Sequence, residues 1–298
     1  MNAVSTEVPM DSNEDNQNYE DWMSSLPEEL WDVPLSSLAI PGSHDAMSYC
    51  LDINSPLIRS ESDTFRVLDG LFYCLTRPAI YRWSTTQEKD IVEQLSKGIR
   101  YFDLRIAHKP YDPSNELYFT HVIYTHLTVM ETLRAVVLWL ESHSKEVVIL
   151  ACSHFEGLDE KLHEHFIFSL KKIFGSKLCP CKGSVVTLRG LWAMGYQVLL
   201  SYDDQSAARH QALWPAIPYW WANQNTSSGS LQTLTLANWK ELKAWLEEQV
   251  PGPHPNSLNI IAGDFIGPVP FCPLVIKLNR KLLRQQRMDQ RTLKAEED

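Results

Sequence analysis

The chain has 298 residues, 44% hydrophobic and 21% charged, which is the composition of a folded globular protein long enough for one α/β barrel or two modest domains. Its formal net charge of −10 at pH 7 argues against a broad nucleic-acid-binding surface, although a local basic pocket remains compatible with it. No apolar run reaches the roughly 18 to 20 residues that a membrane-spanning helix needs.

The N-terminal residues 1–20 are acidic and polar, and they lack the basic start and apolar core of a secretory signal. We therefore expect this segment to be disordered and the protein to be cytoplasmic. The six cysteines are scattered along the chain, and in a cytosolic protein they are expected to stay reduced. Cys179 and Cys181 have a one-residue spacer and no second pair of ligands, so they predict neither a redox motif nor a metal site.

Residues 21–34 carry apolar side chains at roughly helical spacing, and we expect them to pack as a lid under the floor of the fold. The stretch Leu38–Asp45 follows, an apolar strand-like run that stops at a Pro-Gly pair and then presents Ser43, His44 and Asp45. A histidine and a carboxylate at the C-terminal end of a strand lie where α/β enzymes place their chemistry. Adjacent residues of an extended chain point to opposite sides, so these three are not expected to form a Ser-His-Asp relay with one another.

A loop at residues 83–86 is predicted to lead into a helix over Thr86–Lys97. The strand Ile99–Ile106 comes next, and its alternation puts Asp103 and Arg105 on the same face. In an α/β sheet both faces are usually covered, so this pair would be buried or would line a cleft. Because buried charges need a partner or a ligand, we favour a functional role for the pair over plain ion pairing.

His121 lies among apolar residues in the strand predicted at 117–123, and taken alone it would be interpreted as a core histidine. Apolar segments further along the chain predict alternating helices and strands at residues 130–142, 147–152, 166–174 and 197–202. An aromatic group that includes Tyr219 and a Ser/Gly-rich break precede a single predicted helix at 236–249. The last predicted strand again ends at a carboxylate, Asp264.

Strands that alternate with helices predict an α/β fold with a parallel sheet, and polar residues at the strand ends predict a barrel with its site at the top. We expect a single domain over residues 21–283, with a helix near its end at 275–283. The remaining residues 284–298 form a densely charged tail that is expected to fray into solvent.

Two histidines, three aspartates and one arginine at these strand ends are sufficient for phosphodiester cleavage. One imidazole takes a proton from the attacking oxygen, and the other gives a proton to the leaving oxygen. A carboxylate behind each histidine fixes its tautomer and stabilises the imidazolium. The guanidinium offers a planar fork to the phosphate oxygens and balances the charge that builds on them.

Five motifs occur in order along the chain: IPGSHD at 40–45, GIRYFDLR at 98–105, YFTH at 118–121, VVILAC at 147–152 and NIIAGDF at 259–265. Together they resemble the X domain of phosphatidylinositol-specific phospholipase C, and most closely the stand-alone X-domain-containing proteins of animal cells. The resemblance covers roughly residues 22–283. It implies a distorted or incomplete TIM-like (β/α) barrel that cleaves phosphatidylinositol to diacylglycerol and an inositol cyclic phosphate, in lipid degradation and signalling.

The resemblance also implies a role for each candidate catalytic residue. His44 matches the general base that activates the inositol 2-hydroxyl, and Asp264 matches the carboxylate that orients this base. His121 matches the general acid that protonates the departing diacylglycerol oxygen, and Asp45 matches the carboxylate that assists the acid. Arg105 would neutralise the phosphate.

The same positions bear on the cofactor. Calcium-dependent members of the family carry an Asn after the first catalytic histidine and acidic ligands on two further strands. This chain has Asp45, Arg105 and Cys152 at those places and so resembles the metal-independent bacterial-type enzymes. Because a guanidinium in the cage would repel calcium, we expect no metal ion and no other cofactor.

One departure from the family pattern concerns the barrel wall. Similar family members have a further strand and helix between the segment equivalent to 219–221 and the last strand, whereas this interval holds only the Ser/Gly break and one predicted helix. We therefore expect the chain to lack a barrel segment. Asp103, Asp204 and Tyr219 are the candidates for contacts with the substrate.

The first function hypothesis is an active, metal-independent phosphodiesterase that acts on phosphatidylinositol or a related inositol phospholipid. Its contact with the membrane surface would be peripheral, through exposed aromatic residues such as Trp220 and Trp221. The alternative is a catalytically weak or inactive X-domain protein that binds inositol lipids or a protein partner. A glycerophosphodiesterase, from another barrel family, normally uses a cluster of acidic metal ligands, and Arg105 argues against it. Intact His44 and His121 favour the first hypothesis.

Overall fold

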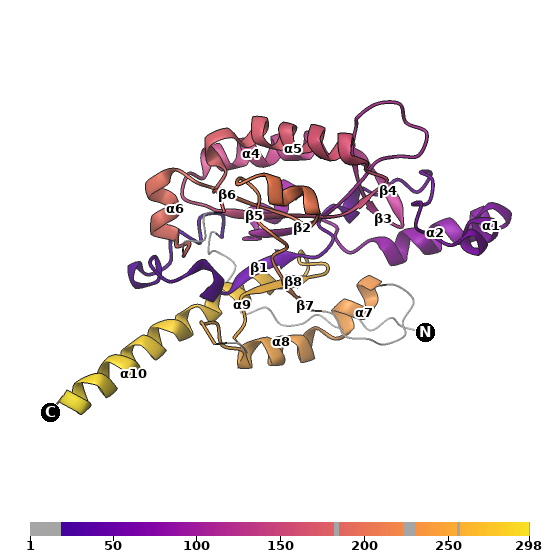
Figure 1. Ribbon diagram of the computed structural model, residues 1–298. Coiled ribbons are helices and arrows are strands. Elements are labelled where there is room, and N and C mark those ends of the chain that lie inside the picture. The colour runs from indigo at the N-terminus through magenta and orange to yellow at the C-terminus, as the bar shows by residue number, and fades with distance from the viewer. Residues whose placement is uncertain (1–18, 182–184, 223–230, 255–256, 298) are drawn as a thin grey trace, which may run out of the picture.

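A central sheet with helices packed on it forms the body of the protein, as the computed structural model shows (Figure 1). The structure describes residues 19–181, 185–222, 231–254 and 257–297. The strands are β1 (Ile40–Ser43), β2 (Tyr101–Ala107), β3 (Tyr118–His121), β4 (Ile123–Thr128), β5 (Val148–Glu156), β6 (Val198–Tyr202), β7 (Trp220–Ala222) and β8 (Ile260–Gly263). The α-helices are α1 (Asp63–Leu71), α2 (Tyr73–Ser84), α3 (Ile91–Ser96), α4 (Val129–Ser142), α5 (Glu160–Phe174), α6 (Leu188–Met194), α7 (Leu231–Ala237), α8 (Trp239–Glu248), α9 (Phe271–Leu278) and α10 (Arg280–Glu297).

The parallel part of the sheet has the strand order β7-β8-β1-β2-β5-β6, which confirms the α/β class predicted from the sequence. A hairpin lies beside β2, because β3 pairs antiparallel with β2 and β4 pairs antiparallel with β3. The sequence predicts one strand over residues 117–123, but the chain reverses at Val122, whose φ is 67°, and continues as β4.

The sheet does not close into a complete barrel within the described residues, because β6 pairs with β5 alone and β7 with β8 alone among the strands. The free edge of β6 is partly covered by Trp214, which exchanges backbone hydrogen bonds with Leu200 and Tyr202. The sequence placed the missing segment between residues 219–221 and the last strand. In the structure β7 pairs directly with β8 and the open side of the sheet lies between β6 and β7, so the place of the missing segment in the sequence stays a prediction. The interval after β7 also contains two helices, α7 and α8, rather than the one predicted.

Helix α3 begins at Ile91, later than the sequence predicts, because Asp90 caps it. The Asp90 carboxylate accepts hydrogen bonds from the N–H groups of Val92 and Glu93, and the Glu93 side chain accepts one from the N–H of Asp90. Residues 85–90 therefore lie outside any helix. Helices α1 and α2 were not predicted, since their segment mixes polar and aromatic side chains without a consistent buried face.

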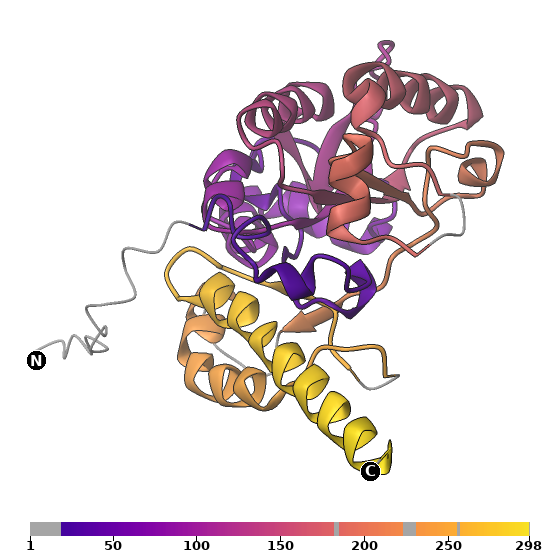
Figure 2. The same ribbon diagram turned by 90° about the vertical axis from the view of Figure 1, so that its left-hand side faces the viewer.

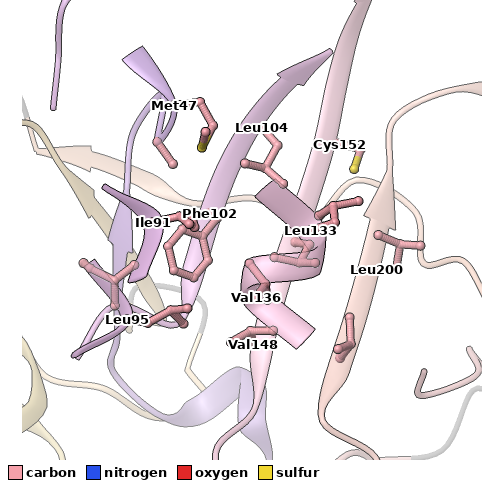
Figure 3. Close-up of a cluster of buried hydrophobic side chains, with 14 of the residues drawn as sticks. Met47, Ile91, Leu95, Phe102, Leu104, Leu133, Val136, Val148, Cys152 and Leu200 are labelled. Carbon is pink, nitrogen blue, oxygen red and sulfur yellow. The ribbon is translucent and has the colours of Figure 1, made fainter. Parts of the chain in front are cut away.

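Two hydrophobic cores lie on the two faces of the sheet. The outer core, part of which Figure 3 shows, packs Phe102, Leu104, Val148 and Leu200 of the sheet against helices that include α3 and α4. The inner core contains the alternate strand residues and the segment after Tyr19, and its buried members include Ile40, Tyr101, Ile149, Leu199, Trp22, Met23, Leu26 and Leu30. The prediction that residues 21–34 pack under the fold is confirmed, although turns and a short 3₁₀ helix replace the expected helical repeat.

The C-terminal residues form helix α10, which extends away from the rest of the molecule in both views (Figure 2). This differs from the frayed tail expected for residues 284–298. The expected disorder of residues 1–20 falls almost wholly outside the described residues, since these begin at Tyr19. Among the helices described, none has the length and apolar character required to traverse a bilayer.

Candidate active site

His44 and Asp264 meet because their strands are parallel neighbours. β1 pairs with β8 in register, with Ser43 opposite Gly263, so the residues that follow them leave the sheet side by side. The Nδ1 atom of His44 lies 2.8 Å from Oδ1 of Asp264, and both side chains are buried. A carboxylate accepts, so Nδ1 carries the hydrogen and the lone pair of Nε2 faces the other way. His44 is thus held in the tautomer that a general base needs.

Arg105 lies between His44 and Asp45. Its Nη2 is 2.8 Å from Nε2 of His44, and its Nε and Nη2 donate to Oδ2 of Asp103 at 3.3 Å. Its Nη1 lies 3.7 Å from Oδ2 of Asp45. Burial would lower the pKa of the guanidinium, but the charges of Asp45 and Asp103 outweigh burial and raise it. The arginine is therefore a fixed positive charge.

His121, on β3, forms a second histidine–carboxylate pair with Asp45. The two residues approach to 2.8 Å between Nδ1 and Oδ2, and the same Nδ1 lies 2.7 Å from the carbonyl oxygen of Ser84. Burial opposes the charged forms of both groups. For His121, the charge of Asp45 outweighs burial and raises the imidazole pKa. For Asp45, the charges of His121, Arg105 and His44 outweigh burial and lower the carboxyl pKa.

The five residues predicted to be catalytic therefore form one connected series: Asp264, His44, Arg105, Asp45 and His121. Each histidine in it is paired with a carboxylate, and Arg105 stands between the two pairs. Its members come from the C-terminal ends of β1, β3 and β8 and from β2, so the topology of the sheet, rather than any local segment, assembles them.

Asp103 and Tyr219, predicted to contact the substrate, lie beside this series. The Oδ2 atom of Asp103 accepts hydrogen bonds from the N–H of Asp45 at 3.1 Å and from the Tyr219 hydroxyl at 3.2 Å. The Tyr219 ring packs 5.2 Å from the Tyr101 ring and 6.5 Å from the His44 ring, measured between centroids. Asp103 thus fixes Tyr219, Arg105 and the backbone of Asp45. It also lines a cavity beside the series.

Asp204, the third predicted substrate contact, lies elsewhere. Its carboxylate accepts hydrogen bonds from Ser206 at the start of a short 3₁₀ helix, and its Oδ2 is 3.9 Å from Nε2 of His163. It borders a separate cavity of about 660 Å³ beside His210. The structure therefore places the Asp204 carboxylate outside the catalytic group, because it is used in capping, and puts the neighbouring Asp203 at the site instead.

A cavity of about 360 Å³ opens beside the series, and its lining includes Tyr101, Asp103, Ser153, His154, Asp203 and Tyr219. His154 was not found from the sequence. It follows the apolar run of β5 at a bulge where its φ is 67°, and burial together with the charge of Arg105 lowers its imidazole pKa. The one signal available in the sequence is its place two residues after the end of the VVILAC motif.

Among the described residues, the cysteines and the other side chains that can bind metals show no assembled site. All six cysteines are thiols. Burial raises the pKa of Cys152 to about 12, so this residue remains a neutral thiol on β5. Within the part of the chain that the structure describes, no group of three or more His, Cys, Asp or Glu side chains is arranged to hold a metal ion.

Comparison with protein-family models and sequences gives matches over most of the chain. A family model described as phosphatidylinositol-specific phospholipase C, X domain, matches residues 79–201. The chain is 46% identical to PI-PLC X domain-containing protein 1 of Homo sapiens, over 89% of this chain and 93% of that protein. It is 43% identical to the Danio rerio protein of the same name, over 85% and 94%, and 34% identical to PI-PLC X domain-containing protein 3 of Homo sapiens, over 87% and 93%.

Comparison with solved structures bears on the fold alone, since the sequence identities are low. The phosphatidylinositol-specific phospholipase C of Listeria monocytogenes aligns with a TM-score of 0.57 at 19% identity, over 88% of this chain and 99% of that one. That of S. aureus aligns with a TM-score of 0.59 at 14% identity, over 88% and 98%. The chain therefore shares the architecture of these bacterial TIM-barrel-type enzymes, with a sheet that stays open.

Proposed function

Because this chain belongs to the phosphatidylinositol-specific phospholipase C X-domain family, we propose that it cleaves the phosphodiester bond of phosphatidylinositol to diacylglycerol and an inositol cyclic phosphate without a metal ion. One observation carries this proposal. Two histidine–carboxylate pairs, one buried and one half-buried, stand on either side of one arginine, and each pair has a nitrogen–oxygen distance of 2.8 Å. This arrangement supplies a base, an acid and a phosphate-binding cation in one place.

In the first half of the reaction, His44 acts as the base. Its Nδ1–H is held by Asp264, so Nε2 accepts the proton of the inositol 2-hydroxyl as that oxygen attacks phosphorus. Asp264 stabilises the imidazolium that results. In the free protein Nε2 accepts from Arg105, so the guanidinium must turn toward the phosphate when substrate binds.

At the other end of the phosphate, His121 acts as the acid. Asp45 raises its pKa, so the ring is protonated at a higher pH than an ordinary histidine and can give a proton to the departing glycerol oxygen. Arg105 meanwhile balances the charge on the non-bridging phosphate oxygens with its planar fork. The guanidinium, which pairs with Asp45 and Asp103, provides this balance from the chain's own residues.

Contact with the membrane is proposed to be peripheral. Trp220 is 58% exposed, in line with the prediction for this aromatic group, while the Trp221 side chain lies outside the described set. A larger exposed apolar surface lies on α1 and α2, which we name the apolar patch: Val67, Leu68, Leu71, Phe72 and Leu75. Helix α2, which carries Leu75 of the patch, ends at Ser84, whose carbonyl oxygen contacts His121.

The alternative is a protein that binds inositol lipids or a protein partner with little or no catalysis. The open side of the sheet between β6 and β7 favours it, because an open wall constrains the strand ends less than a closed barrel does. In that case the same pocket would bind an inositol headgroup without cleaving the phosphodiester bond.

Phosphorus NMR on a soluble short-chain phosphatidylinositol separates the two functions. The proposed reaction gives a cyclic phosphate signal that grows with time at the expense of the substrate signal. A binding protein would broaden or shift the substrate signal and form no product. A glycerophosphodiesterase would leave intact phosphatidylinositol unchanged and would cleave deacylated glycerophosphoinositol instead.

A further inference from the structure

The extended segment Ser84–Gln87 joins the strand ends that carry the candidate catalytic groups. The carbonyl of Ser84 contacts His121. The carbonyl of Thr86 accepts a hydrogen bond from the N–H of Phe265 at 2.7 Å, directly after Asp264. The side chains of Thr86 and Gln87 are fully buried and reach the end of β1. None of these residues touches the cavity beside Arg105.

Gln87 ties β1 to β8. Its Nε2 donates to the carbonyl oxygen of His44 at 3.0 Å and to that of Gly263 at 2.8 Å. The backbone N–H of His44 also donates to the Gly263 carbonyl, at 3.2 Å. The carboxamide therefore fixes the spacing of the two backbone positions from which the base and its orienting carboxylate, Asp264, project.

Thr86 holds the backbone of His44 and Asp45 through a second set of hydrogen bonds. The hydroxyl oxygen of Ser48 accepts from the N–H groups of Thr86 and Gln87, at 2.9 and 3.0 Å. The Ser48 hydrogen is therefore available for the Thr86 hydroxyl oxygen, 2.7 Å away. The Thr86 hydroxyl can then donate to the carbonyl of His44 at 2.9 Å, with that of Asp45 at 3.1 Å.

The backbone held in this way is strained. Asp45 has a φ of 45° in the left-handed region that residues with a Cβ adopt at a cost, and Phe265 after Asp264 has a φ of 47°. Such conformations persist where surrounding contacts fix them, and here the contacts come from Thr86 and Gln87. The strain turns Asp45 toward His121 while His44, the preceding residue, turns toward Asp264.

We propose that Thr86 and Gln87 are positioning residues for the reaction, which hold the backbone of His44 and Asp45 so that the base and the acid each face their carboxylate. The proposal rests on the proposed function. Its physical basis is that a displacement of about 1 Å at a reacting group costs on the order of 10²-fold in rate. The side chains of Thr86 and Gln87 are fully buried, so both residues act through His44 and Asp45.

The test compares two buried glutamines. Gln87→Met keeps the side-chain length and removes the N–H donors. Gln197→Met is the matched control, because the Nε2 of Gln197 donates to three backbone carbonyls, those of Leu140, His143 and Glu146, just before β6 at the opposite end of the sheet. For each protein, kcat and KM are measured on soluble short-chain phosphatidylinositol, and histidine ring nitrogen chemical shifts report the tautomer of His44.

We expect Gln87→Met to lower kcat by about 10- to 100-fold with KM little changed, and to mix the tautomers of His44. Gln197→Met should lower the melting temperature and leave kcat and the tautomer as they are. A folded Gln87→Met protein with wild-type kcat and a single His44 tautomer would overturn the proposal. So would an equal loss of kcat in Gln197→Met.

Two further variants decide the matter if Gln87→Met does not fold. Thr86→Ser keeps the hydroxyl and should behave as wild type, while Thr86→Val removes it and should lower kcat and mix the tautomers. Equal behaviour of these two variants would overturn the role of Thr86. If the wild-type protein shows no hydrolysis, the proposed function fails, and the His44 tautomer then decides the positioning role by itself.

Discussion

Two arginines near the two ends of β2 show how the same residue type can have different roles. Arg100, just before the strand, is fully buried and saturated. It donates to Glu146 and to the carbonyls of Leu95, Ile99 and Glu20. Arg105, within the strand, has a side chain that is 16% exposed and holds Asp103 only at 3.3 Å.

The difference in pairing between Arg100 and Arg105 indicates which end of the sheet carries the candidate site. At the N-terminal end of the sheet every donor of the cation has a close partner, which fastens the segment around residues 19–26 under the inner core. At the other end Arg105 lies beside a cavity, contacts His44 at 2.8 Å and holds its carboxylate partners only at 3.3 and 3.7 Å. Left-handed non-glycine residues gather at this end, at Asp45, Val122, His154, Phe155 and Phe265. Strain and incomplete pairing of this kind are typical of functional sites.

The largest expected effect is on stability, at Arg100. Arg100→Met leaves Glu146 buried without its partner, so the free energy of unfolding should fall by about 3–5 kcal/mol. Urea unfolding followed by circular dichroism measures the change. Arg189→Met is the control, because that arginine pairs with Asp32 on the surface and its loss should leave the unfolding midpoint in place. An equal midpoint for Arg100→Met and wild type would erase the contrast between the two ends of β2.

Arg105 should show the reverse behaviour. Arg105→Met removes the cation proposed to face the phosphate, and kcat/KM on phosphatidylinositol should fall by about 10²- to 10³-fold. Its effect on the unfolding midpoint should be smaller than that of Arg100→Met, since Asp45 keeps His121 and Asp103 keeps Tyr219. Full activity of Arg105→Met would show that the guanidinium has no part in catalysis.

Asp45 should set the alkaline limit of activity. The pKa of His121 is raised, so the acid stays protonated above the usual histidine range, and activity is lost as pH rises through this raised value. In Asp45→Asn burial prevails, the His121 pKa falls, and the alkaline limb of the pH–rate profile moves to lower pH, with activity above neutral pH reduced by about tenfold. Asp204→Asn is the control, because Asp204 lies outside the site. A limb that stays in place in Asp45→Asn would refute the acid role.

The smallest expected effect concerns the apolar patch. Leu71→Asp places a charge on a side chain that is 70% exposed on α1, and binding to phosphatidylinositol-containing vesicles should fall severalfold because apolar contact area is lost. Phe168→Asp, on α5 and 67% exposed, should bind as wild type does. Co-sedimentation measures both variants, and an equal loss for the two would mean that the patch has no special role.

The α/β class and the residues of the candidate site could be predicted from the sequence because both depend on patterns that are continuous along the chain. The apolar strands carry their own signal, and His44, Asp103, Arg105 and Asp264 follow or lie within them. Pairing of base with carboxylate followed from the family resemblance, and the neighbouring positions of β1 and β8 provide its structural basis.

What the sequence missed depends on contacts between distant segments. The carbonyls that Gln87 binds lie 43 and 176 residues away in the chain, and no local pattern indicates them. His154 faces the cavity because of a bulge in β5. Simple alternation along the strand would place its side chain on the opposite face of the sheet. Asp203 and Asp204 are adjacent and chemically identical, so only the cap formed with Ser206 shows which of the two is already occupied.

The most direct test of the central claim is the release of inositol cyclic phosphate from phosphatidylinositol vesicles in excess chelator, for the wild-type protein, His44→Ala and His121→Ala. We expect the wild-type protein to release product in chelator and both variants to release none above background. Folded wild-type protein without activity, or activity that chelator abolishes, would contradict metal-independent acid–base cleavage by these two histidines.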